Sequence, residues 1–271
     1  MKITVLPSLL APLALLWTVA PAAASSAPAS PSPSLAQEEI PDKREDIKKL
    51  LDDFDDLAGE RGEKDREAIE VIDRLVQEFA GCGPKDRAAI VKQLGKCFDE
   101  RRKEVDGAPD NRLFLASATA LGEMGPESAD ELEKWIGHKK HRSDLTLQRR
   151  LVLSLGKTKV IDALPTLTNL LTDKDDTIVG AAAEALANYD EIELDKRKKV
   201  FEDLLKTLMS AKAGIDRDVN DVRARERYDV VAAPLLTSLK RLSKHEEART
   251  PEDWQRWWNK NKREDWDKDA E

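Results

Sequence analysis

The chain has 271 residues, enough for one extended domain or two small ones. Charged residues make up 36% of it and aromatic residues only 5%, a composition that suits a helical array with many solvated faces. The formal net charge of −8 is moderate and spread along the chain, which argues against a nucleic-acid-binding protein.

Residues 1–24 are predicted to be a secretory signal peptide. Lys2 supplies a minimal positive start, the stretch from Ile3 to Ala20 is mostly apolar, and Ala22-Ala23-Ala24 offers a small-residue cleavage pattern. The alternative is a transmembrane anchor, against which three prolines and the weak charge flank argue. No cysteine follows the apolar run, so a lipoprotein anchor is not indicated. We expect an exported chain, periplasmic, in the cell envelope or secreted, with no membrane span after cleavage.

The rest of the chain divides by composition. Residues 25–40 are rich in Ser, Pro and Ala and are predicted to be a disordered linker. Residues 41–247 are expected to form a helical repeat domain, and residues 248–271 a tryptophan-rich helix with a charged tail. Apolar stripes at helical spacing predict the first three helices over Pro41–Leu57, Ala68–Phe79 and Ala88–Phe98.

Two cysteines, Cys82 and Cys97, flank the third of these helices. Export would permit a disulfide. A continuous helix would nevertheless separate the two residues by roughly 15–20 Å, whereas a bridge needs Cα atoms within about 7 Å. We expect no bond between them, and they are too few for a structural zinc site.

A helical segment recurs three times, over Asp110–Gly122, Asp144–Gly156 and Thr177–Tyr189. The aspartates Asp110, Asp144 and Asp175 that lead these segments are offset by 34 and 31 residues. Each of them is predicted to pair with the helix that follows it, over Ala129–Ile136, Ile161–Leu171 and Asp195–Met209 respectively. Such a period is typical of a solenoid, because each helical pair can bury its apolar face only against its neighbours.

The most regular segment, LLTDKDDTIVGAAAEALA from Leu170 to Ala187, resembles a HEAT repeat of the short kind found in the HEAT-like family that includes phycobilin lyases. The residues that match that family's pattern are Leu170, Leu171, Asp173, Asp175, Ile178, Ala182, Ala183, Ala185 and Leu186. The family arginine is replaced by Phe114, Gln148 and Val179 in the three copies. The resemblance covers about residues 110 to 211. It implies an all-α, armadillo-type α-solenoid of stacked antiparallel helix pairs, and it carries little functional specificity.

Beyond the repeats, the segment from Ser210 to Val219 loses apolar content and is predicted to be a long loop. A helix is expected over Val222–Leu242, kinked or split by Pro234. Thr250-Pro251-Glu252-Asp253 then forms a favourable helix start, with a hydroxyl cap, a proline at the first helical position and carboxylates in the first turn.

Trp254, Trp257 and Trp258 follow at i, i+3 and i+4 and should share one helix face. HEAT-like proteins predicted to be exported often end in a similar tryptophan-rich helix, which adds to the resemblance. The face has two interpretations: a docking surface for a sugar, peptide or protein, or a capping helix that closes the open end of the solenoid. Burial of Trp254 and Trp258 against the segment Leu235–Leu239 would decide for the cap.

The loop GHKKHRSD, residues 137–144, concentrates positive charge. His138 and His141 could bind a metal, but the spacing supplies no third ligand, so a solvated loop is the alternative. Lys139, Lys140 and Arg142 could instead contact an anionic partner.

Two further patterns receive structural interpretations. The carboxylates at 173, 175 and 176 lack the twelve-residue spacing of a calcium loop and are expected to cap a helix. Gly156-Lys157-Thr158 lacks the earlier glycine of a phosphate-binding loop. We find no paired nucleophile and base, and we predict no cofactor and no metal.

The sequence therefore supports a non-enzymatic scaffold that binds another protein or an envelope component outside the cytoplasm. The candidate contact residues are the three tryptophans, the basic loop residues Lys139, Lys140 and Arg142, and Lys196 and Lys199 of a later helix. An enzyme or enzyme accessory related to HEAT-like lyases and a structural envelope protein are the alternatives.

Overall fold

The fold was analysed in a computed structural model that describes residues 42–105, 107–246 and 248–268. The predicted signal peptide, residues 1–24, and the predicted linker, residues 25–40, lie outside the described residues. No helix in the described ranges combines the length and the apolar character that a membrane crossing needs.

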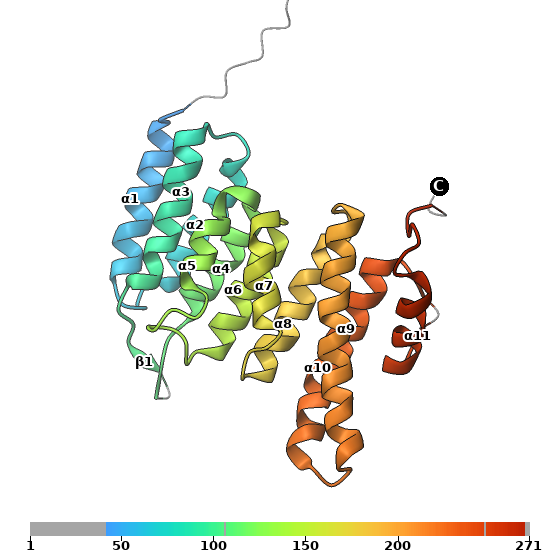
Figure 1. The fold of residues 1–271 in the computed structure, drawn as a ribbon. Coiled ribbons are helices and arrows are strands. Elements are labelled where there is room, and N and C mark those ends of the chain that lie inside the picture. Colours follow the sequence, from blue (N-terminus) through green and yellow to red (C-terminus); the bar gives the residue numbers. More distant parts are fainter. Residues whose placement is uncertain (1–41, 106, 247, 269–271) are drawn as a thin grey trace, which may run out of the picture. The chain divides into compact units, whose positions relative to one another are not determined.

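The described residues form eleven α-helices and one very short hairpin (Figure 1). The helices are α1 (Glu45–Gly59), α2 (Asp65–Phe79), α3 (Pro84–Lys96), α4 (Arg112–Glu123), α5 (Ala129–Trp135), α6 (Leu145–Lys157), α7 (Leu164–Leu170), α8 (Asp176–Leu186), α9 (Leu194–Arg217), α10 (Val222–Ser243) and α11 (Pro251–Asn261). The hairpin pairs the two-residue strands β1 (Glu104–Val105) and β2 (Ala108–Pro109) in antiparallel register.

The helices are arranged in two layers that follow the chain. Helices α2, α4, α6, α8 and α10 form one layer, in which each contacts the next. Each odd-numbered helix from α1 to α9 packs on the even-numbered helix that follows it in the chain, so that α1 packs on α2 and α9 on α10. The three aspartate-led helices, α4, α6 and α8, therefore lie side by side, as Figure 1 also shows. The predicted all-α solenoid of stacked helical pairs is confirmed.

Small residues set the distance between neighbouring helices of the first layer. A Cβ atom on Gly122 of α4 would stand 2.8 Å from the Cβ of Ser154 on α6. A Cβ atom on Gly156 of α6 would stand 2.6 Å from the Cα of Ala185 on α8. Both glycines follow the last leucine of their repeat, so the repeat pattern itself specifies a close helix contact.

Polar contacts hold the repeats together where the family arginine is missing. Phe114, Gln148 and Val179, which replace it, are all buried. Asn111 Nδ2 instead donates to Asp144 Oδ2 of the next repeat at 2.8 Å. Arg149 of α6 pairs with Glu184 of α8 at 2.9 Å. The predicted caps are present in α6 and α8, where Asp144 accepts from Leu147 N and Asp175 from Thr177 N.

The predicted loop from Ser210 to Val219 is wrong, because helix α9 continues to Arg217. Ala211 is buried, and a Cβ on Gly214 would lie 3.4 Å from the Cβ of Ala224, so small side chains let α10 pack closely here. Packing against α10 therefore maintains a helix that has lost its apolar stripe. The predicted pairing of each aspartate-led helix with the helix after it is also revised, since α5, α7 and α9 pack chiefly on α6, α8 and α10.

Pro234 does not split its helix, contrary to the expectation, because α10 is continuous from Val222 to Ser243. The proline ring faces Gly180 of α8, where a Cβ would lie 3.5 Å from the ring in ordinary contact. Ser238 Oγ bonds to the carbonyls of Pro234 and Ala183, both at 2.8 Å, which ties this turn of α10 to α8. Tertiary packing thus compensates for the missing amide.

Candidate functional site

The predicted tryptophan face is part of the hydrophobic core. Trp254 is 1% exposed, and its indole lies 5.8 Å from the ring of Phe201 on α9, between ring centroids. Trp257 and Trp258 approach the same phenylalanine at 5.4 and 5.2 Å. Trp254 is enclosed against α9, as the capping interpretation expects, whereas Trp257 and Trp258 are half-buried. The contact is with Phe201 of α9 rather than with the segment Leu235–Leu239, so a docking role for the tryptophan face stays a prediction.

The helix that carries these tryptophans begins as the sequence predicted. Thr250 Oγ1 accepts from Asp253 N at 3.1 Å, and the Asp253 carboxylate accepts from Thr250 N at 3.0 Å, which completes a capping box. Bonds from the backbone and side chain of Thr250 lower the pKa of Asp253 to about 2. After the helix, Asp267 binds the buried Arg197 guanidinium at 2.8 Å and so fastens the tail to α9.

Lys196 and Lys199 lie exposed on α9, as expected for surface residues. Their ammonium groups pair with carboxylates of the same region, Lys196 with Glu193 at 3.4 Å and Lys199 with Asp203 at 3.3 Å. Neither residue lines a hollow described below. They form a solvated helix surface that is separate from the basic loop.

His141 is buried, which corrects the expectation of a solvated loop for this residue. Its Nε2–H donates to the carbonyl of Phe98 at 2.7 Å, and its ring lies 5.0 Å from that of Phe114 and 5.7 Å from that of Trp135. Burial lowers the pKa of His141. The histidine therefore anchors the loop to the core, and no cluster of three potential metal ligands occurs in the described ranges.

With His141 anchored, Lys140, Ser143 and Asp144 of the basic loop border a hollow of about 720 Å³, whereas Lys139 lines neither this hollow nor the next. The hollow lies between this loop, the start of α6 and the segment that leads from α3 to α4. It brings together two basic stretches that are far apart in the sequence, 101–103 and 139–142. Its lining residues are Glu100, Arg101, Arg102, Gly107, Asn111, Phe114, Lys140, His141, Ser143, Asp144, Leu145 and Thr146.

A second hollow, of about 520 Å³, lies between the starts of α6 and α8 and shares Ser143 and Leu145 with the first. It is lined by Ile136, Gly137, Arg142, Ser143, Leu145, Gln148, Val152, Leu170, Asp173, Lys174, Asp175 and Ile178. We refer to the residues that line these two hollows as the loop edge. The loop edge runs past the first turns of α4, α6 and α8.

Some charged groups of the loop edge form hydrogen bonds within the protein, whereas others have no partner among the described residues. The carboxylates of Asp173 and Asp175 accept bonds from backbone amides at 2.8 and 2.9 Å. The cations of Arg101, Arg142 and Lys174 are exposed and form no ion pair within 4.0 Å among the described residues. These two aspartates are thus held by the fold, whereas the three cations are directed to solvent.

A buried ion pair stiffens one wall of the loop edge. Arg102 and Asp65 bond at 2.9 Å with side chains that are almost wholly enclosed, and the Arg102 guanidinium lies 5.0 Å from the centre of the Phe114 ring. Burial raises the pKa of Asp65 against the opposing effect of Arg102. Breaking such a pair would leave an uncompensated buried charge. The segment before α4 is therefore held firmly in place.

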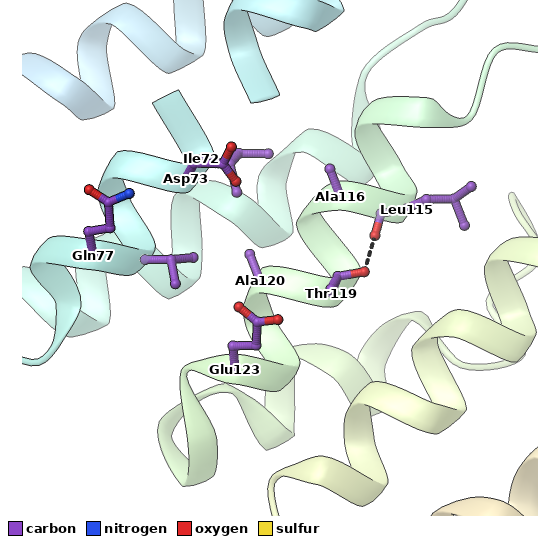
Figure 2. A pocket seen from close by; sticks show the side chains of 9 residues that line it. Ile72, Asp73, Gln77, Leu115, Ala116, Thr119, Ala120 and Glu123 are labelled. Carbon is purple, nitrogen blue, oxygen red and sulfur yellow. Dashed lines mark hydrogen bonds between the residues drawn. The ribbon is translucent and has the colours of Figure 1, made fainter. Parts of the chain in front are cut away.

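A third hollow, of about 460 Å³, lies between α2 and α4 and is drawn in Figure 2. The small side chains of Ala116 and Ala120 face Ile72 across an apolar floor, and Asp73 and Glu123 stand at its rim. Thr119 Oγ1 donates to the carbonyl of Leu115 at 2.8 Å, so its hydroxyl is already engaged. The hollow has no cation in its lining, which distinguishes it from the loop edge.

The two cysteines are buried thiols at either end of α3. Burial raises the pKa of Cys97 to about 12, and its Sγ lies 3.0 Å from Ser117 Oγ. Burial also raises the pKa of Cys82. Since the thiolate is the nucleophile, both residues are chemically inert core side chains.

Comparison with known proteins identifies part of the chain. Residues 98–187 match the family model described as HEAT repeats. The match extends from the end of α3 through α8 and includes every residue of the loop edge. No curated protein and no solved structure matches the chain. HEAT repeats generally serve as scaffolds for protein interaction.

Proposed function

From the HEAT repeats of residues 98–187, we propose that the protein is an exported, non-enzymatic scaffold that binds another protein along the loop edge. The resemblance of Leu170 to Ala187 to the short repeats of phycobilin lyases extends the proposal to the repeat subtype, without pigment chemistry. The pattern of residues 1–24 supports export.

The main observation behind this proposal is the exposure of Leu145. Leu145 is 40% exposed, and it lies at the junction of the two hollows and lines both of them. Leu145 is flanked by Arg101, Arg142 and Lys174, which form no ion pair among the described residues. An apolar side chain surrounded by charged groups matches the usual arrangement of a protein contact surface, with an apolar centre and a polar rim.

The arrangement of reactive groups supports binding over catalysis. The ring N–H of His141 donates to the Phe98 carbonyl. The thiols of Cys82 and Cys97 are enclosed in the core, and burial raises the pKa of both. These side chains stabilise the repeats, and the exposed side chains at the loop edge are those of Arg101, Lys140, Arg142, Lys174, Leu145, Ser143 and Thr146. Loss of a measurable turnover in a Cys82→Ala variant would contradict the proposal.

A capture experiment tests the scaffold role. Tagged wild-type protein is recovered from the exported fraction together with its bound proteins, beside a Leu145→Glu variant and a Lys49→Glu control, an exposed change on α1. We expect a stoichiometric partner with the wild type and the control, and its loss with Leu145→Glu. Recovery of the chain alone in all conditions would favour a structural envelope protein, and retention in the cytoplasm would contradict export.

A further inference from the structure

We infer that the loop edge recognises an extended acidic segment of the partner that carries an aliphatic side chain between its carboxylates. This inference rests on the proposed function and adds the chemistry of the partner to it. It follows from the charges, the apolar contacts and the length of the loop edge.

The first observation is that most cations of the loop edge have no ion-pair partner among the described residues. Arg101 and Lys140 border the first hollow, and Arg142 and Lys174 border the second. Among the described residues, only Lys140 of these four has an ion-pair partner, Asp99 at 3.8 Å. The chain as a whole carries a formal charge of −8, so this concentration of free cations is a local exception. A partner with carboxylates would be both attracted and oriented here.

The second observation is that the aspartates of the loop edge already have donors, whereas the Glu100 carboxylate has none among the described residues. Asp144 accepts from Leu147 N and from the Asn111 amide, at 3.0 and 2.8 Å. Asp173 and Asp175 accept from the amides at the start of α8. These carboxylates have a structural task at helix starts, and they do not form ion pairs with Arg142 or Lys174. The cations therefore remain available to carboxylates from outside the chain.

The third observation is the apolar surface between the cations. Leu145 stands at the junction, and the second hollow adds Ile136, Leu170 and Ile178 to its lining. An aliphatic side chain placed there would remove Leu145 from water, which is worth about 25 cal/mol per Å² of apolar area buried. The partner therefore needs an apolar residue as well as acidic ones. A purely acidic tail would leave Leu145 exposed.

The length of the loop edge fits a short extended segment. The two hollows span the starts of α4, α6 and α8, which are two helix spacings of about 8–10 Å each. An extended chain advances about 3.3 Å per residue. Roughly six residues of a partner would therefore reach from Arg101 to Lys174. A folded nucleic acid would instead bring its phosphates against Asp144, Asp173 and Glu100, which lie on the same edge.

Fluorescence anisotropy with a labelled peptide tests the inference on the full chain. The probe is a peptide of about eight residues with glutamates on both sides of two central leucines. One matched peptide carries Gln in place of every Glu, and another carries Ser in place of both Leu. We expect the first probe to bind, and each matched peptide to bind at least about tenfold more weakly, which corresponds to about 1.4 kcal/mol. Added salt should weaken the first complex.

Charge reversal in the protein locates the contact. Arg101→Glu and Arg142→Glu should each weaken binding about tenfold or more. Lys49→Glu, an exposed change on α1, is the matched control and should leave the affinity within about twofold. Thermal melts followed by circular dichroism verify that all three variants are folded. Equal binding of the glutamate and glutamine peptides would overturn the inference, and so would a single-stranded RNA that displaces the peptide.

The outcome separates this inference from the proposed function. If capture recovers a partner that depends on Leu145 but the acidic peptide does not bind, the scaffold role stands and the acidic chemistry is refuted. If the peptide binds at the loop edge and capture recovers no partner, the acidic chemistry stands and the scaffold role fails.

Discussion

At the scale of single residues, two glycines of neighbouring helices have opposite packing roles. Gly156 of α6 contacts the backbone of Ala185, and an added Cβ would stand 2.8 Å from the Ala185 carbonyl oxygen. Gly180 of α8 has only the Pro234 ring and the Val230 carbonyl nearby, at 3.5 and 3.8 Å from an added Cβ. The same substitution should therefore change stability in opposite directions.

We predict that Gly156→Ala lowers the free energy of unfolding by about 1–3 kcal/mol, because helix α6 would be forced away from α8. Gly180→Ala should raise it by about 0.5–1 kcal/mol, because alanine favours the helix and the contact is unstrained. Urea denaturation followed by circular dichroism measures both values. Equal effects of the two substitutions would show that helix contact at Gly156 is not the constraint.

His141 should make stability depend on pH. Burial lowers its pKa in the folded state below the ordinary value of about 6.5, so the unfolded chain binds the extra proton more readily. The free energy of unfolding should therefore decrease as the pH falls through about 6.5 toward 5. His141→Phe should be less stable at about pH 8, because the Phe98 carbonyl loses its donor. Its pH profile between about 5 and 7 should also be flatter than that of the wild type. A variant profile that keeps the wild-type slope would contradict this assignment.

At the scale of elements, α11 stabilises the chain by covering the outer side of α9. Trp254 is enclosed against Phe201, whereas Arg256 on the same helix points to solvent. We predict that Trp254→Ala lowers the free energy of unfolding by about 3–5 kcal/mol. Arg256→Ala should change it by less than about 0.5 kcal/mol. Hydrogen exchange should show faster opening of α11 in the first variant only. If Trp254→Ala left exchange unchanged, α11 would not depend on this contact.

At the scale of the whole molecule, stability depends on each helical pair being covered by the next. Helix α10 covers α8 through Gly180 and Ala183, and α11 covers α9. We predict that removal of residues 218–271 exposes these apolar faces and yields a protein that aggregates and binds a hydrophobic dye. Analytical ultracentrifugation and dye fluorescence measure this outcome. A soluble, cooperatively folding fragment would show that α10 is dispensable for the repeats.

The sequence by itself determined the repeat architecture, because the same apolar, small and capping residues recur at about the same spacing and each has a local physical effect. It also determined the helix start at Thr250 and the repeated glycines, whose roles depend on near neighbours in the chain. The loop edge could be predicted only in part: Lys139, Lys140 and Arg142 were evident as a basic loop, and Lys140 and Arg142 line the hollows.

Only the tertiary structure decided the features that depend on contacts between distant segments. Packing against α10 keeps α9 helical to Arg217, and Pro234 lies within a continuous helix that packs beside Gly180 of α8. His141 is part of the core because Phe98, more than forty residues earlier, supplies its acceptor. Arg101 joins the basic loop, and Leu145 remains exposed, only through the stacking of α4, α6 and α8. Local patterns specify helices and their ends, whereas burial and the meeting of charges are properties of the packed chain.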